Sequence, residues 1–228
     1  MTHALLDRLR HFRPEKLPGM KPFNESSNIG CPWWSWCLKD PVGELPRGIL
    51  VMQDWGVDGE TFQEAVDTLE NSSKRLPDSN ADRTLKNLFD ERREWGRAIV
   101  KRQVLVTNAA WGLREGKDKC SYLGAKTHKA AFLTWVHLVA SIAEAKSDDE
   151  FRLFAAGCWA TFDDGKNPSD LRDYLMKWQN WASQGRYKVD GNIGSLEKCR
   201  GKVVYLRHPC LWQRMSESEV SPWARTAP

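Results

Sequence analysis

Three polar side chains of chemically useful types each follow a short apolar run in this sequence. Asp54 follows ILVMQ, Asn108 follows VLVT and His208 follows VVYLR. A carboxylate stabilises a neighbouring cation and activates water, an amide both donates and accepts hydrogen bonds, and an imidazole stabilises developing negative charge. Each residue also has a structural explanation, as a turn cap, as a partner of loop amides, or as an extended residue before a proline. Their shared position after apolar runs favours a common site.

The elements that must position these residues follow from the hydrophobic pattern. Four short apolar runs predict strands buried on both faces of a sheet: GILVMQD, QVLVTN, FRLFAAG and KVVYLRHP. Helical periodicity predicts four helices between and around them: Asp58–Leu76, Thr84–Lys101, Thr127–Lys146 and Pro168–Trp181. The alternation predicts an α/β fold, a three-layer sandwich with a central four-stranded, mainly parallel sheet. Ligands on such sheets bind beyond the carboxyl ends of the strands.

The N-terminal part of the chain has a different composition. Residues 1–46 are rich in tryptophan and proline, and we expect an irregular segment packed on a domain formed by residues 47–228, with a short helix near Ala4–Arg10. The chain holds 12 tryptophans, and several gather around the first predicted strand: Trp33, Trp34, Trp36 and Trp55. Two interpretations stay open for this group, namely core packing and an aromatic rim at a pocket mouth.

Charge and composition narrow the class of protein. The net charge is only +4, but residues 184–214 carry seven cationic and two anionic side chains. Such a segment suits either contacts to phosphates or a solvated basic face. The sequence has no apolar run of membrane-spanning length and no secretory-type N-terminus, so we expect a cytoplasmic protein without a membrane partner. Its six cysteines are then expected to be thiols or metal ligands rather than disulfides.

The segments that carry the three polar residues read MQDWG, VTNAAWGLR and HPCLW. In order and separation they resemble the motifs of the uracil-DNA glycosylase superfamily, over Gly48 to about Arg214. The resemblance implies that Asp54 positions or activates the attacking water, that Asn108 binds the edge of an extruded base, and that His208 stabilises the departing base. It implies a glycosylase-like α/β domain and hydrolysis that leaves an abasic site, and we expect the protein to act as a monomer on double-stranded DNA with a flipped base.

Further residues receive roles around this centre. We assign the base pocket, besides Asn108, to five residues: Gln53, Trp55, Gly56, Phe62 and Trp111. We assign DNA contacts and a wedge that fills the place of the flipped base to four residues: Arg207, Leu211, Trp212 and Arg214. Simple hydrophobic packing is the alternative for the apolar part of that loop.

Gly56 departs from the family pattern. The uracil-specific members carry there a tyrosine that excludes bases with a substituent at the five-position. The open wall and the aromatic cluster favour a bulky five-substituted pyrimidine, with glucosylated hydroxymethylcytosine of phage DNA, and hence antiphage defence, as the leading expectation. Uracil repair is one alternative, and a catalytically inactive DNA-binding module of the same fold is another. Cys31 and Cys37 are spaced too widely for the cysteine pair of the iron–sulfur members, so we expect no cluster, zinc or other cofactor.

Overall fold

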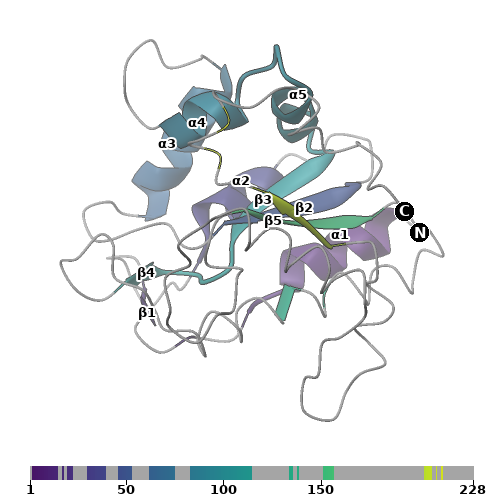
Figure 1. The fold of residues 1–228 in the computed structure, drawn as a ribbon. Helices are drawn as coiled ribbons and strands as arrows, with labels where there is room; N and C mark the ends of the chain where they lie inside the picture. Colours follow the sequence, from purple (N-terminus) through teal and green to yellow (C-terminus); the bar gives the residue numbers. More distant parts are fainter. Residues whose placement is uncertain are drawn as a thin grey trace, which may run out of the picture.

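The computed structural model describes the strands of a central sheet, the helices around it and several shorter segments (Figure 1). The described residues are 2–14, 17, 20–22, 30–39, 46–52, 62–74, 83–114, 134–135, 138, 151–156, 203–206, 209 and 212.

A parallel sheet forms the centre of the described structure. Its strands are β2 (Gly48–Met52), β3 (Val104–Asn108), β5 (Arg152–Ala156) and β6 (Val203–Leu206), in the spatial order β3-β2-β5-β6. Every neighbouring pair runs parallel. β2 and β3 are buried along their whole length, as continuous runs of branched apolar residues predict for a sheet covered on both faces. The prediction of an α/β fold built on parallel strands is confirmed.

The register brings the carboxyl ends of the strands to one level. Met52 pairs with Asn108, Val51 with Ala155, and Ala156 with Leu206. The chain moves from β2 to β3 on one side, whereas from β5 it moves to β6 on the other. The direction of winding therefore reverses between the neighbouring strands β2 and β5, and a parallel sheet opens a crevice at such a point.

Five helices are described in full. They are α1 (Thr2–His11), α2 (Pro32–Lys39), α3 (Phe62–Lys74), α4 (Arg83–Leu88) and α5 (Glu94–Val100). In the view of Figure 1, α3, α4 and α5 lie above the strands and α1 lies below them, and α2 packs against both α3 and β3. Two short strands, β1 (Met20–Lys21) and β4 (Leu113–Arg114), pair antiparallel apart from the main sheet. None of the helices in these ranges has the length and apolar composition that a membrane crossing requires.

Two expectations about helices are wrong. The single helix predicted over Thr84–Lys101 is two helices, because the chain turns at residues 89–93. There Asp90 accepts hydrogen bonds from the backbone and the guanidinium of Arg92, which favours a turn over a continuing helix. Gly96 then lies so close to this turn that a Cβ atom would stand 2.2 Å from the carbonyl oxygen of Asp90.

The N-terminal segment is also more regular than expected, because residues 32–39 form α2. A proline in the first turn starts this helix without loss of a hydrogen bond, as is typical of prolines there. Among the other predicted helices, Thr134, Trp135 and Leu138 are helical within the range 127–146. The helix predicted over 168–181 lies outside the described residues.

The core joins the N-terminal segment to the sheet. Trp33 and Trp36 are 3% and 2% exposed, and each packs on Phe89, with ring centroids 5.8 and 5.2 Å apart. The guanidinium carbon of Arg102 also lies close to Trp36, 3.3 Å from its ring centroid. The interpretation of Trp33 and Trp36 as a pocket rim is therefore wrong. Their indoles have no free face for a ligand, because they hold α2 against the loop before α5.

Candidate functional site

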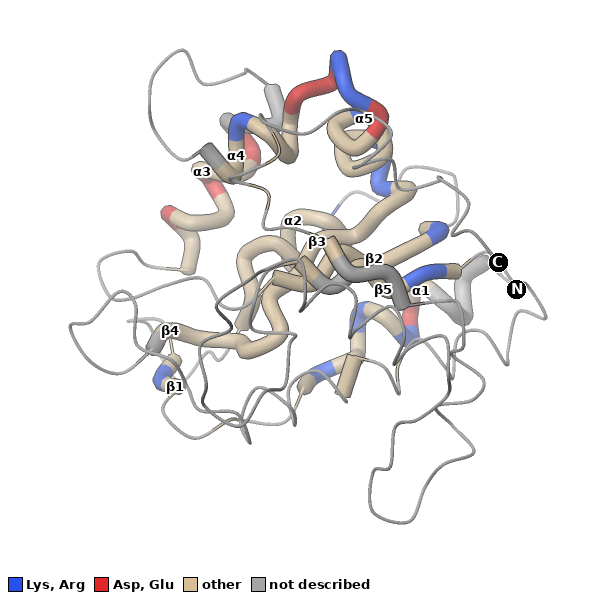
Figure 2. The backbone as a smooth tube through the Cα atoms, viewed as in Figure 1, with Lys and Arg blue, Asp and Glu red and all other residues tan. Residues whose placement is uncertain are grey.

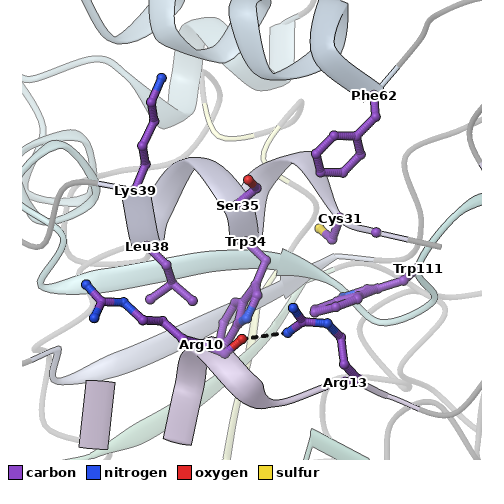
Figure 3. Close-up of a pocket in the computed structure, with 10 residues that line it drawn as sticks. Arg10, Arg13, Cys31, Trp34, Ser35, Leu38, Lys39, Phe62 and Trp111 are labelled. Carbon is purple, nitrogen blue, oxygen red and sulfur yellow. Dashed lines mark hydrogen bonds between the residues drawn. The ribbon is translucent and has the colours of Figure 1, made fainter. Parts of the chain in front are cut away.

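A pocket of about 410 Å³ opens beside the carboxyl end of β3 (Figure 3). Its aromatic wall consists of Trp34, Phe62 and Trp111. Its cationic side chains are Arg10, Arg13 and Lys39. The remaining described residues that line it are small, apolar or uncharged: Gly30, Cys31, Ser35 and Leu38. No carboxylate lines the pocket within the described part of the chain, so its electrostatic character is positive.

Four separate segments build this pocket. Arg10 lies in the last turn of α1, and Arg13 follows that helix. Cys31 precedes α2, and Phe62 is the first residue of α3. Figure 3 shows Phe62 on one side of Cys31 and Trp111 on the other, with Arg13 beside Trp111. The backbone amide of Gly112 donates to the carbonyl oxygen of Gly30 at 3.0 Å, which ties the turn after β3 to the entry of α2.

Asn108 lies behind the pocket wall and is 2% exposed. The thiol of Cys31 donates to its side-chain oxygen Oδ1 at 3.4 Å, and the Asn108 backbone amide donates to the Cys31 sulfur at 3.3 Å. The hydroxyl of Thr107 lies 3.6 Å from the same sulfur and accepts a hydrogen bond from the Trp111 indole at 3.1 Å. These contacts form a continuous polar network from the pocket wall to the end of β3.

The two described cysteines keep their protons. Burial raises the pKa of the Cys31 thiol, and burial likewise raises the pKa of Cys37 to about 12. A protonated Cys31 is a hydrogen-bond donor, which is what the oxygen of Asn108 requires. The sulfur of Cys37 accepts a hydrogen bond at 3.2 Å from the backbone amide of Val106, which lies two residues before Asn108 in β3. Both sulfurs thus contact the backbone of β3, and among the described residues no three His, Cys, Asp or Glu side chains gather as a metal site requires.

The structure brings together three of the residues assigned to the base pocket. Phe62 and Trp111 line the cavity, and Asn108 connects to its wall through Cys31. The other assigned residues lie outside the described part of the chain: Gln53, Asp54, Trp55, Gly56, Arg207, His208, Leu211 and Arg214.

Trp212 is an anchor of the core and not part of a wedge. Its side chain is fully buried, and its ring centroid lies 5.0 Å from that of Trp95. Its carbonyl oxygen accepts a hydrogen bond from Arg93 at 2.9 Å, and the carbonyl oxygen of Pro209 accepts one from Asn87. The assignment of Trp212 as an inserting residue is wrong, because an indole packed in this way cannot enter DNA without unfolding its surroundings.

Sequence reasoning missed Arg10, Arg13 and the role of Cys31. Arg10 lies in the last turn of the predicted short helix and Arg13 follows it, and the sequence offers no pattern that gives either a role. The contact of Cys31 with Asn108 spans 77 residues of sequence. No local pattern reports a contact of that separation.

No protein-family model, curated protein or solved structure matches this chain. What the geometry itself defines is a protein of the parallel α/β class. Its described pocket is cationic and aromatic, and it lies beside the carboxyl end of β3, a buried strand at the edge of the sheet.

Proposed function

We propose that this protein is a monofunctional DNA glycosylase, which extrudes a pyrimidine from DNA and hydrolyses its N-glycosidic bond. The observation that carries the proposal is the register of the parallel strands. Met52 is level with Asn108, and Ala156 is level with Leu206, so β2, β3 and β6 end at one edge of the sheet. The glycosylase resemblance assigns functions to Asn108, Asp54 and His208. Asp54 comes two residues after Met52, and His208 comes two residues after Leu206.

Both of the other groups follow directly on a strand end. Asp54 is two residues after Met52, the last residue of β2, and His208 is two residues after Leu206, the last residue of β6. β2 and β6 are separated by β5 alone, which corresponds to about 10 Å between strand axes. This spacing is of the order of a nucleoside, so we assign the sugar to Asp54 and the departing base to Asn108 and His208.

The proposed reaction follows from these positions. The oxygen of a water molecule bonds to C1′ of the sugar as the bond from C1′ to the base nitrogen breaks, and the electron pair leaves with the base. Asp54 accepts the proton of the water and stabilises the positive charge on the sugar. His208 stabilises the negative charge on the departing base. The base anion then takes up a proton from solvent as Asp54 releases its own, so the products are a free base and an abasic site.

The described pocket supports extrusion of a base. Phe62 and Trp111 offer aromatic surface on either side of Cys31 (Figure 3), and bases stack on such side chains. Asn108 is one hydrogen bond away from this wall. Binding of an extruded base requires an aromatic surface for stacking and a side chain that hydrogen-bonds its edge. Phe62 and Trp111 would supply the first and Asn108 the second, all near the end of β3.

The proposed substrate is a pyrimidine with a bulky five-substituent, glucosylated hydroxymethylcytosine first among them. Gly56 in place of a blocking tyrosine carries this part of the proposal. The buried Trp33 and Trp36 lend it no support, whereas Trp34 remains on the pocket wall. Uracil is the second candidate substrate.

A panel of matched oligonucleotides tests the proposal. Each contains uracil, thymine, hydroxymethylcytosine or glucosylated hydroxymethylcytosine, and alkali-labile strand breaks report base release. We expect breaks with the glucosylated base and a loss of roughly a hundredfold or more in Asp54→Asn. Asp67→Asn, on the exposed face of α3, is the matched control and should act as the wild type. Breaks with uracil alone would make ordinary repair the function, and binding without breaks on every substrate would leave only a DNA-binding module.

A further inference from the structure

We propose that Arg13 and Arg10 form a phosphate-binding subsite on the cationic side of the pocket. The phosphate belongs to the DNA strand that carries the target base. This inference rests on the proposed function, and it assigns DNA contact to the end of α1, far in sequence from the basic segment 184–214. Figure 2 shows basic residues along α1 in blue.

Arg13 is held in place before any ligand arrives. Its Nη1 atom donates to the carbonyl oxygens of Arg10 at 2.6 Å and Phe12 at 2.7 Å. Its guanidinium carbon lies 5.8 Å from the ring centroid of Trp111. Two carbonyls and an aromatic face therefore fix one edge of the guanidinium, and less side-chain entropy is lost when a ligand binds.

The rest of the Arg13 guanidinium suits an anion with two oxygens. Its Nε and Nη2 atoms donate no hydrogen bond to the described residues, and the side chain lines the pocket, so we assign this planar fork to the phosphate. A planar fork of this kind binds a phosphate through two parallel hydrogen bonds. A lysine offers the charge without the fork.

Arg10 is the second cation of the subsite. Its contact with Asp7 is 3.5 Å long, and both side chains are largely exposed, at 40% and 57%. An exposed ion pair of this length contributes little to stability, so a phosphate competes with it readily. Lys39, the third cation around the pocket, is paired with Glu70 and is therefore a weaker candidate.

The surroundings favour a nucleotide phosphate over other anions. The same pocket presents the aromatic rings of Trp34, Phe62 and Trp111, and the described residues that line it include no carboxylate. A ligand that combines a planar ring with a phosphate satisfies both parts of the wall. DNA with an extruded nucleotide has these two groups next to one another.

The experiment measures DNA binding as a function of salt. An Asp54→Asn background prevents turnover, and fluorescence anisotropy of a labelled duplex with a glucosylated hydroxymethylcytosine is recorded between about 50 and 200 mM salt. We expect Arg10→Ala/Arg13→Ala to lower the slope of log K against log salt by about 1, since one neutralised phosphate contributes about 0.9. We expect affinity at low salt to fall roughly tenfold or more. Arg13→Lys should keep most of the slope but bind more weakly.

Arg8→Ala is the matched control, because Arg8 lies on the same helix and does not line the pocket. Its slope should equal that of the parent protein, and circular dichroism should show every variant folded. An unchanged slope in the double variant would overturn the phosphate subsite, even if the wild type releases a base. A reduced slope in the double variant, together with no base release by the wild-type protein, would support the phosphate subsite and overturn the proposed glycosylase activity.

Discussion

The thiol of Cys31 lies 3.4 Å from the side-chain oxygen of Asn108, and the backbone amide of Asn108 donates back to the same sulfur. This paired contact fixes which end of the amide faces α2. The oxygen is turned toward Cys31. In the proposed function the amide of Asn108 binds a pyrimidine edge, so its orientation determines which hydrogen-bonding groups the base meets.

Replacing Cys31 tests this relationship. Cys31→Ala removes the donor to the Asn108 oxygen, so the amide loses its fixed orientation. We expect base release to fall on the order of tenfold to a hundredfold, as is typical when a binding group is misplaced. The side-chain amide resonances of Asn108 should also shift in NMR spectra of the free protein. Cys37→Ala is the matched control, because its sulfur contacts Val106 instead. Equal activity in the two variants would contradict a positioning role for Cys31.

The buried thiols predict a strong protection from alkylation. Because burial raises the pKa of Cys37 to about 12, only about one molecule in ten thousand carries its thiolate at pH 8, against about one in ten for an ordinary value of 9.0. Modification by iodoacetamide, followed by peptide mass spectrometry, should be far slower in the native protein than in urea. Raising the pH toward 12 should both speed it and destabilise the fold, since the unfolded thiol loses its proton first. Equal rates in the native and unfolded chains would refute this burial.

Asp90 makes stability depend on pH at the acid end. Hydrogen bonds from the Arg92 guanidinium to both carboxylate oxygens hold the pKa of Asp90 below its ordinary value of 3.8. The lowered pKa means that its stabilising effect is present above about pH 4 and is lost as the pH falls through the lower, folded-state value. Asp90→Asn should therefore flatten the fall in urea midpoint between about pH 5 and pH 2. Glu91→Gln, at the exposed neighbouring position, is the control and should leave the curve unchanged.

We expect Trp212→Ala to lower the stability of the protein and Leu211→Ala to lower its activity. Trp212→Ala empties a fully buried site against Trp95, so we expect a loss of about 3 to 5 kcal/mol in the free energy of unfolding. Leu211→Ala keeps that contact, and as a predicted wedge it should lower base release from a duplex by roughly tenfold while single-stranded DNA is little affected. Urea unfolding and base-release rates on both substrates separate the two effects. Unchanged activity of Leu211→Ala on duplex DNA would contradict the assignment of Leu211 as a wedge.

The sequence by itself determined the strands and their class of sheet. Runs such as ILVM and VLV are buried on both faces wherever they fold, because branched apolar side chains without polar alternation have no solvent face to turn outward. Their alternation with amphipathic segments predicted parallel pairing, and Asn108 was correctly expected at a strand end. These are local properties, and short stretches of sequence report them well.

Tertiary structure alone decided which side chains meet. The segment PWWSWCLK was expected to be irregular because of its proline and tryptophan content, yet it forms α2, which packs against β3, α3 and Phe89. Trp212 was expected at a DNA surface and lies instead in the core beside Trp95. The contact between Cys31 and Asn108 joins residues 77 positions apart, and the contact between Arg13 and Trp111 joins residues 98 positions apart. Packing energy, which depends on all neighbours at once, outweighs local preference at such positions, so no single segment encodes them.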